Sequence, residues 1–304
     1  MSSPTIVGRL NGPAAVVQRP ALSPTALALR RFRAHRLAIF GTALLLLIVG
    51  VTISAPFIAP YDPIAVDLSA TRRPPSTAHI LGTDSTGRDV LSRLMHAAQV
   101  SLAVGLSAAL LQTGVGLSLG LLAGYYRGWV DSVISRVTEI VLSYPLLIVI
   151  IVIVAILGPG QNSIILGIGL FGWPTACRIV RGLVFSLREQ DFVLAARCIG
   201  VSDRRLISRH LLPLVVGPLT VTATFAVAYA VLLEASLSFL GLGIRPPRPS
   251  WGNMLNEAQS LPILESMPWL WLPPGAAIAL TVLAINFVGD GLRDAVDPRQ
   301  RAIR

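Results

Sequence analysis

Residues 194–213, LAARCIGVSDRRLISRHLLP, place small, basic and helix-breaking residues at spacings that suit the docking of another protein. Apolar or small residues recur at positions i, i+3, i+4 and i+7 from Phe192, which predicts a short amphipathic helix. The small side chains of Ala195 and Ala196 let a partner surface approach closely, and the nearby arginines can meet acidic groups on it. Gly200 can take the left-handed conformation that ends the helix. The pattern indicates docking rather than catalysis.

A second helix is expected to follow, so that the two form a helix-turn-helix elbow over residues 188–212. Ser202 is a suitable N-cap for this helix, and Asp203 lies favourably at its positive end. Pro213 is expected to separate the second helix from the next long apolar segment. The segment is therefore predicted to be a basic elbow between two apolar stretches.

Catalytic and metal chemistry have little support in the sequence. All 25 basic residues are arginine, so the chain lacks the lysine of an ordinary nucleotide-binding P-loop and any lysine that could form a Schiff base. No nucleophile has a base and an orienting acid nearby. The histidines and cysteines are dispersed without metal-ligand spacing; they are His35, His79, His96, His210, Cys177 and Cys198. We expect no catalytic residue, no metal site and no cofactor in this chain.

The composition places the elbow in a membrane protein. Hydrophobic residues make up 53% of the chain and charged residues 13%, with a mean hydropathy of +0.70. A bilayer core about 30 Å thick needs roughly 20 helical residues. Six stretches meet this length, two of them separated by the turn sequence GPGQN. The predicted spans are 37–58, 100–124, 134–157, 163–184, 214–240 and 271–290. We therefore expect an all-α polytopic membrane protein with six transmembrane helices.

The placement of the arginines predicts the orientation. Most of the arginines fall in segments that lie inside if the N-terminus is inside, and positive residues near a span resist translocation. The expected topology is therefore N-in and C-in. The arginines lie in gaps between apolar segments and form no single stripe, so we expect no nucleic-acid partner.

One acidic residue and one small-residue face stand out within the predicted spans. Glu234 lies about two turns inside the outer end of the fifth span, a depth at which an ionisable residue is a functional candidate. It lines the translocation path, forms an outer gate, or makes a structural hydrogen bond to a neighbouring helix. Gly116, Gly120 and Gly124 recur every four residues in the second span and predict close helix packing, within the subunit or across a dimer interface.

Two predicted outside loops are polar and stiff. GTDSTGRD contains charged residues among glycines, and RPPRPSWGN contains prolines, arginines and a tryptophan. These loops either dock an external protein or only close the outer face of the bundle. The candidate docking residues are Asp84, Arg88, Asp89, Arg245, Arg248 and Trp251.

The elbow resembles the EAA loop of permease subunits of bacterial ABC importers. The resemblance rests on the pair Ala195 and Ala196, on Gly200 after three intervening residues, and on the sequence HLLP after nine more residues. Leu194 stands at the position where the motif's name has glutamate. In that family the loop supplies a coupling helix that sits in a cleft of the ATP-hydrolysing subunit. The resemblance implies that the coupling residues are Ala195, Ala196, Gly200, Ser202, Asp203, His210, Leu212 and Pro213.

Further segments resemble the C-type permease of dipeptide and oligopeptide importers. They are RRFRAHRLAIFG, HILGTDSTGRDVLSRLMHAAQVSLAVG (79–105), EASLSFLGLGIRPPRPSWGNML (234–255) and DGLRDAVDPR. The resemblance implies the ABC importer permease fold, in the bacterial inner membrane. It divides the chain into a cytoplasmic tail with a basic surface helix (1–36), the first span and outside loop (37–99), the permease core (100–292) and a cytoplasmic tail (293–304).

The resemblance also implies the partners and the substrate. The partners would be a homologous permease in a heterodimer, two ATPase subunits that bind ATP and magnesium, an extracytoplasmic substrate-binding protein, and membrane lipid. The substrate would be a dipeptide or oligopeptide, with nickel or glutathione as alternatives. An ion-coupled secondary transporter and a structural or channel-like subunit remain as other classes of function.

Overall fold

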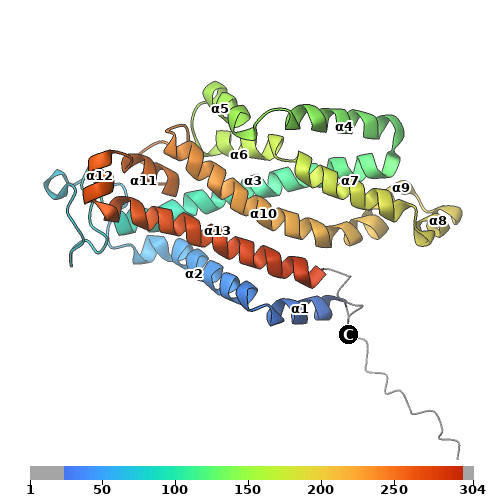
Figure 1. Ribbon diagram of the computed structural model, residues 1–304, viewed down its shortest axis with the longest axis horizontal. Coiled ribbons are helices and arrows are strands. Elements are labelled where there is room, and N and C mark those ends of the chain that lie inside the picture. The colour runs from blue at the N-terminus through green and yellow to red at the C-terminus, as the bar shows by residue number, and fades with distance from the viewer. Residues whose placement is uncertain (1–23, 297–304) are drawn as a thin grey trace, which may run out of the picture.

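The computed structural model describes residues 24–296, and every regular element in that range is helical (Figure 1). The longer helices are α1 Pro24–Ala34, α2 Arg36–Ile58, α3 Val90–Tyr126, α4 Gly128–Leu142, α5 Leu146–Leu157, α6 Gln161–Phe171, α7 Pro174–Arg188, α10 Leu212–Phe239 and α13 Pro268–Val296. The shorter ones are η1 Leu68–Ala70, α8 Asp191–Cys198, α9 Asp203–Leu206, η2 Ile207–Leu211, α11 Trp251–Glu257 and α12 Leu261–Ser266. Most of the two predicted tails, residues 1–23 and 297–304, lies outside the described residues.

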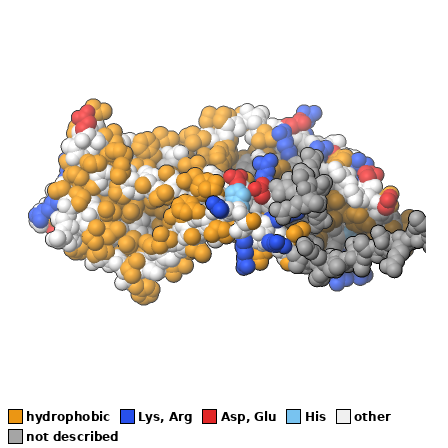
Figure 2. All heavy atoms as spheres, turned by 60° about the horizontal axis from the view of Figure 1, so that its bottom comes forward, with side chains coloured by type: hydrophobic (Ala, Val, Ile, Leu, Met, Phe, Trp, Pro, Cys, Tyr) orange, Lys and Arg blue, Asp and Glu red, His pale blue; other side chains and the backbone are white. Residues whose placement is uncertain are grey.

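Five helical stretches are long and apolar enough to cross a membrane. They are α2, α3, the α6–α7 pair, the helix that runs through α9, η2 and α10, and α13. α3 contacts α2, α6, α7 and α10, and the five stretches lie lengthwise in one bundle (Figure 1). Large apolar side chains stay exposed on its outside, with Phe57 of α2 at 88%. Figure 2 shows hydrophobic side chains spread over a broad part of one face, as expected for contact with lipid. The predicted all-α, multi-span architecture is confirmed.

The predicted third span is bent. The sequence suggested one continuous helix over 134–157, but α4 and α5 meet at an angle of 84°. The bend follows from Pro145, which has no N–H to donate to the carbonyl of Val141 and disfavours a helical conformation at Tyr144. The GPGQN turn is confirmed, since α5 ends at Leu157 and Gly158 has φ +86°. The bent pair counts as the sixth span if it is taken as one segment.

The second span begins earlier than predicted. α3 starts at Val90 instead of residue 100, and the Asp89 carboxylate caps it by accepting a hydrogen bond from the Ser92 N–H at 2.8 Å. Its first turn contains two polar residues that are buried, Ser92 at 0% and Arg93 at 2% exposure. A search for uncharged stretches cannot find a helix start of this kind.

The small-residue face of α3 packs within the subunit. A Cβ added at Gly120 would lie 2.7 Å from Val180 Cβ and 2.8 Å from the carbonyl oxygen of Cys177, both in α7. Gly116 and Gly124 approach α7 equally closely. The glycines therefore let α3 and α7 touch backbone to backbone, which decides between the two alternatives that the sequence left open.

The candidate sites lie at opposite ends of the bundle (Figure 1). The α8 end carries α8, α9 and the turn between them. The α11 end carries α11, α12 and the long connection between α2 and α3.

Candidate functional site

The elbow at the α8 end has the predicted helix-turn-helix form. Gly200 follows α8 with φ +77°, and its N–H donates to the carbonyl of Arg197 at 2.9 Å. The N–H of Val201 donates to the carbonyl of Ala196 at 3.1 Å. These two bonds make the Schellman pattern that ends a helix, and the left-handed residue in it favours glycine. Gly200 therefore sets the direction in which the chain leaves α8.

The side chains of α8 are divided between two surfaces. Val193 and Ala196 are buried, and both belong to a core cluster with residues of α7, α9 and α10. Phe192, Ala195 and Ile199 face outward, with Ile199 81% exposed. The predicted single apolar face is therefore wrong in one respect, because Ala196 packs inward. The side chains that stay exposed on this face are apolar, and their docking role stays a prediction.

Tyr125, at the end of α3, ties the elbow to the bundle. Its hydroxyl donates a hydrogen bond to the Asp203 carboxylate, and its carbonyl accepts one from Arg188 Nη1 at 2.5 Å. The Arg197 guanidinium lies 5.0 Å from the centre of the Tyr125 ring. This residue joins α3, α7, α8 and α9. Sequence reasoning missed Tyr125, because its partners are far away in the chain and only its aromatic type could have pointed to it.

Ser202 and Asp203 begin α9 as predicted, but the segment that follows differs from the prediction. Ser202 occupies the N-cap position, but its hydroxyl oxygen accepts no hydrogen bond from the N–H groups of the helix. The helix then continues through Pro213 to Phe239, so the prediction that this proline separates two helices is wrong. The chain widens into the π turn η2 just before the proline, where the Leu212 N–H donates to the carbonyl five residues back. This widening accommodates the ring and the missing N–H. Of the remaining predicted coupling residues, His210 is half-buried in this turn, Leu212 is half-buried directly after it, and Pro213 is exposed.

The α11 end holds a buried ionic cluster that joins the loop before α3 to α11. Arg88 Nε lies 2.7 Å from an Asp84 carboxylate oxygen, and Arg88 Nη2 lies 3.1 Å from both Glu257 oxygens. Arg93 pairs with Asp84 and binds Glu257 through two nitrogens, at 2.6 and 2.8 Å. Sequence reasoning missed Arg93 and Glu257, because two charges 164 residues apart give no pairing signal.

The other predicted docking residues at this end are not equally exposed. Asp89 is buried as the cap of α3 and lies 3.0 Å from His79 Nδ1. Trp251 is buried, and its ring N–H donates to the carbonyl of Leu94 at 3.3 Å. Arg245 and Arg248 are exposed. A docking role stays a prediction for all six residues, but these two arginines alone among them present their side chains to solvent.

The ionic cluster predicts a dependence of stability on pH. Burial opposes ionisation of Asp84, but the charge of Arg93, the hydrogen bond from the Thr86 N–H and the charge of Arg88 outweigh it, so its pKa lies below the ordinary value. A carboxylate with a lowered pKa stabilises the fold fully above its unfolded-state pKa, about 4, and this contribution is lost as the pH falls through the folded-state pKa.

We therefore expect Asp84→Asn to lower the stability by about 3 kcal/mol at pH 7, because it removes one partner from a buried pair. The difference from wild type should shrink as the pH falls toward 3. The measurement is the apparent melting temperature in detergent across this range, with Glu265→Gln, an exposed carboxylate on α12, as the matched control. A difference that stays constant with pH would contradict this role of the Asp84 charge.

Glu234 is fully buried in α10 and hydrogen-bonded at both oxygens. One oxygen accepts from Ser101 Oγ of α3 at 2.8 Å and the other from Ser238 Oγ at 2.7 Å. Ser101 Oγ in turn accepts from the Trp251 N–H at 3.3 Å. The structural hydrogen bond to a neighbouring helix is therefore present. A role for Glu234 in the pathway or in a gate stays a prediction.

The fold and the elbow together define a class, the membrane-spanning subunit of an ABC importer. The chain belongs to the family of binding-protein-dependent transport system inner membrane components, which matches residues 116–302. Residues 23–75 match the N-terminal transmembrane domain of oligopeptide transport permease C. The protein is therefore a multi-pass inner-membrane permease subunit.

Individual relatives cover nearly the whole chain. A Brucella suis protein whose name describes a peptide permease is 44% identical over 276 residues, which are 91% of each chain. The dipeptide transport system permease protein of Alkalihalophilus pseudofirmus is 38% identical over 99% of this chain and 98% of its own. The solved structure of the MetNI methionine ABC transporter in an inward-facing conformation aligns with 67% of this chain and 96% of its own, at 19% identity and a TM-score of 0.55. At that identity the structural likeness supports the fold alone.

Proposed function

We propose that this chain is a permease subunit of an ATP-driven importer of short peptides. The observation that carries the proposal is its full-length similarity to permeases named for peptide and dipeptide transport. Nickel and glutathione stay open as alternative substrates. Membership of the binding-protein-dependent family decides against an ion-coupled secondary transporter.

The chain would form half of the translocation pathway and pair with a homologous permease. ATP hydrolysis would take place in two partner subunits, which would bind at the α8 ends of the two permeases. The exposed face of Phe192, Ala195 and Ile199 supports this role, because an apolar surface at a basic end of the bundle suits a protein partner. The proposal puts the α8 end in the cytoplasm, which is supported by the arginines around the elbow, since positive residues near a span resist translocation.

Movement of the ATPase would reach the bundle through Tyr125. A movement of α8 would reach α3 through the contact of Arg197 with the Tyr125 ring, and a movement of α9 would reach it through the hydrogen bond between Tyr125 and Asp203. Since α3 packs against α2, α6, α7 and α10, it can transmit that movement as a rigid-body change. The extracytoplasmic binding protein would dock at the α11 end, where Arg245 and Arg248 are exposed.

The test is a pull-down of the tagged, detergent-solubilised protein from its native membrane, with two double variants. Ala195→Arg with Ile199→Arg changes only exposed side chains, whereas Ala196→Arg would also disturb the core. We expect this variant to recover the second permease as wild type does. The amount of co-purified ATPase should fall about tenfold or more, because an unpaired charge buried in the interface costs several kcal/mol.

The matched variant, Arg245→Glu with Arg248→Glu, lies at the opposite end. It should retain the ATPase, and after reconstitution it should lose the stimulation of ATP hydrolysis by the loaded binding protein. Full recovery of the ATPase with the elbow variant would contradict the coupling role. Unchanged stimulation with the arginine variant would contradict docking at the α11 end.

A further inference from the structure

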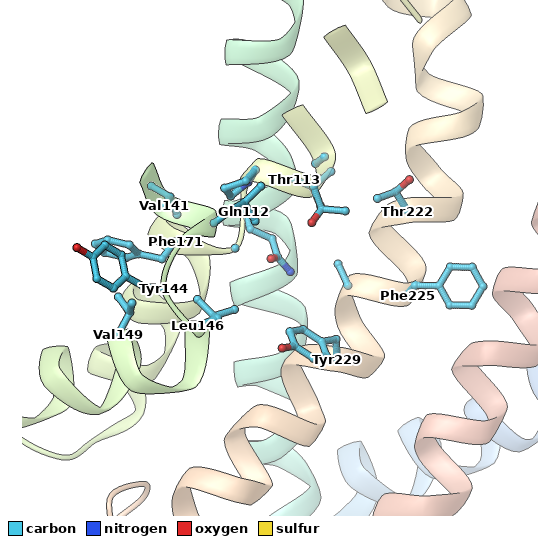
Figure 3. Close-up of a pocket in the computed structure, with 16 residues that line it drawn as sticks. Gln112, Thr113, Val141, Tyr144, Leu146, Val149, Phe171, Thr222, Phe225 and Tyr229 are labelled. Carbon is cyan, nitrogen blue, oxygen red and sulfur yellow. The ribbon is translucent and has the colours of Figure 1, made fainter. Parts of the chain in front are cut away.

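A cavity of about 410 Å³ lies beside the middle of α3 and α10, within the size range of small-molecule sites (Figure 3). Its wall comes from α3, α10, the α4–α5 bend and the junction between α6 and α7. Glu234 is not among the residues that line it. The cavity is therefore separate from the buried carboxylate and from both ends of the bundle.

Two polar groups at the cavity have no partner in the described part of the chain. The Gln112 side chain is 5% exposed, and its Nε2 donates no hydrogen bond. The Thr113 hydroxyl is also buried and unpaired. A buried donor without an acceptor costs free energy, so such a group calls for an explanation. Figure 3 shows the Gln112 amide extending into the space toward which the Tyr229 ring also points.

The backbone around the cavity is interrupted twice. Tyr144 and Leu146 flank the α4–α5 bend, and Gly172 and Pro174 flank the junction between α6 and α7. Non-helical backbone at membrane depth is tolerated where it lines a cavity or is buried in protein. In secondary transporters, which are a different class, broken helices of this kind form substrate sites, so the same backbone arrangement is known to suit a bound substrate. The breaks and the unpaired amide are independent observations at the same place.

The chemistry of the lining defines what fits the cavity. The lining residues, all within the described range, include aromatic, aliphatic, threonine and glutamine side chains, and none is an aspartate, glutamate, arginine or histidine. Such a site offers no ion pair to a charged side chain. It offers apolar contact together with a free amide donor and hydroxyls, which match the carbonyl groups of a peptide backbone.

We infer that this cavity binds the substrate in transit, with Gln112 Nε2 donating a hydrogen bond to a backbone carbonyl of a short peptide. Tyr229 and Phe171 contact the peptide's side chains, and Thr113 and Thr222 offer further hydroxyls. Recognition through the backbone suits a permease that must pass peptides of differing sequence. The inference rests on the proposed function and assigns the site to named residues.

Gln112→Leu separates a transport role from a structural role. Because Nε2 is unpaired, an apolar side chain of similar size should leave the melting temperature unchanged or raise it. Loss of the bond to the substrate should lower uptake by about fivefold. A purely structural glutamine would show the opposite, a lower melting temperature with uptake per folded complex unchanged.

Ala226→Leu is a second variant, which fills part of the cavity and leaves Gln112 unsubstituted. Its matched control is Ala223→Leu on the same helix, since Ala223 lines a different groove, toward α2 and α3. We expect the first to reduce uptake strongly and the second to leave it near wild type.

The experiment uses the complete importer, purified through a tag on this chain and reconstituted with its binding protein and ATP. The probe is radiolabelled alanyl-phenylalanine. Wild-type uptake of the dipeptide by both Gln112→Leu and Ala226→Leu would overturn the cavity assignment while leaving the proposed function intact, and would fit a cavity occupied by water or lipid. No uptake by the wild-type complex, with its ATPase active, would overturn the proposed function and this inference with it.

Discussion

Gly200→Pro is expected to abolish ATP-driven uptake while leaving the chain folded in the membrane. The wild-type residue has φ +77° and donates its N–H to the carbonyl of Arg197. Proline fixes φ near −65° and has no N–H, so it can satisfy neither requirement. A penalty of about 3 kcal/mol lowers the population of the native elbow about a hundredfold. The bundle lies beyond the turn and should stay intact.

Gly182→Ala is the matched control for this variant. Gly182 lies in α7 close to the elbow, and an added Cβ there meets no atom within 4 Å. Uptake by this variant should equal that of wild type. The measurement is ATP-dependent dipeptide uptake, normalised to the amount of folded complex determined by size-exclusion chromatography. Uptake by Gly200→Pro at the wild-type rate would refute the coupling role of the elbow.

The elbow could be predicted because its signals are local. Ala195, Gly200 and Asp203 lie within nine residues, and a helix end, a turn and a helix start each require particular residue types. The spans could be predicted for a similar reason, since lipid requires a long run of apolar residues whatever the tertiary contacts are. Local chemistry and hydropathy therefore predicted the architecture.

The features that escaped prediction depend on distant contacts. Tyr125 and Asp203 are 78 residues apart, and Arg93 and Glu257 are 164 apart, so neither pair has a signature in the sequence. The Gln112 amide is significant only because its Nε2 finds no acceptor among residues 24–296. Such features are set by packing, which one sequence read alone does not specify.

The α4–α5 bend is a different case, because its signal was present. The sequence SYP contains the proline that stops α4, but the apolar residues on both sides favoured a continuous span. Hydropathy does not distinguish a straight helix from a bent one. Here the proline decides the backbone geometry. A bend at Pro145 relieves the clash of its ring with the preceding helical turn, and the apolar side chains on both sides are kept.

Gly120→Leu is expected to destabilise the bundle strongly, because the α3 glycine face packs closely against α7. Its Cβ alone would lie 2.8 Å from the carbonyl oxygen of Cys177, a backbone atom that cannot rotate away, and the rest of the leucine has no room. Overpacking in a close-packed interior typically costs about 1 to 3 kcal/mol. We expect a cost at or above the upper end of this range, because α3 and α7 must separate along their whole contact. The yield of monodisperse protein and its melting temperature should both fall sharply.

The matched control, Gly114→Leu, lies on the same helix, where an added Cβ meets nothing within 4 Å. It should be neutral or should stabilise α3, because the helix propensity of leucine is more favourable than that of glycine by roughly 1 kcal/mol. The comparison therefore separates close packing from helix propensity. If both variants melted at the wild-type temperature, α3 and α7 could not be in backbone contact. The proposed transmission of movement from Tyr125 through α3 would then lose its structural basis. α3 and α7 can move as one rigid body only if the two helices are in close contact.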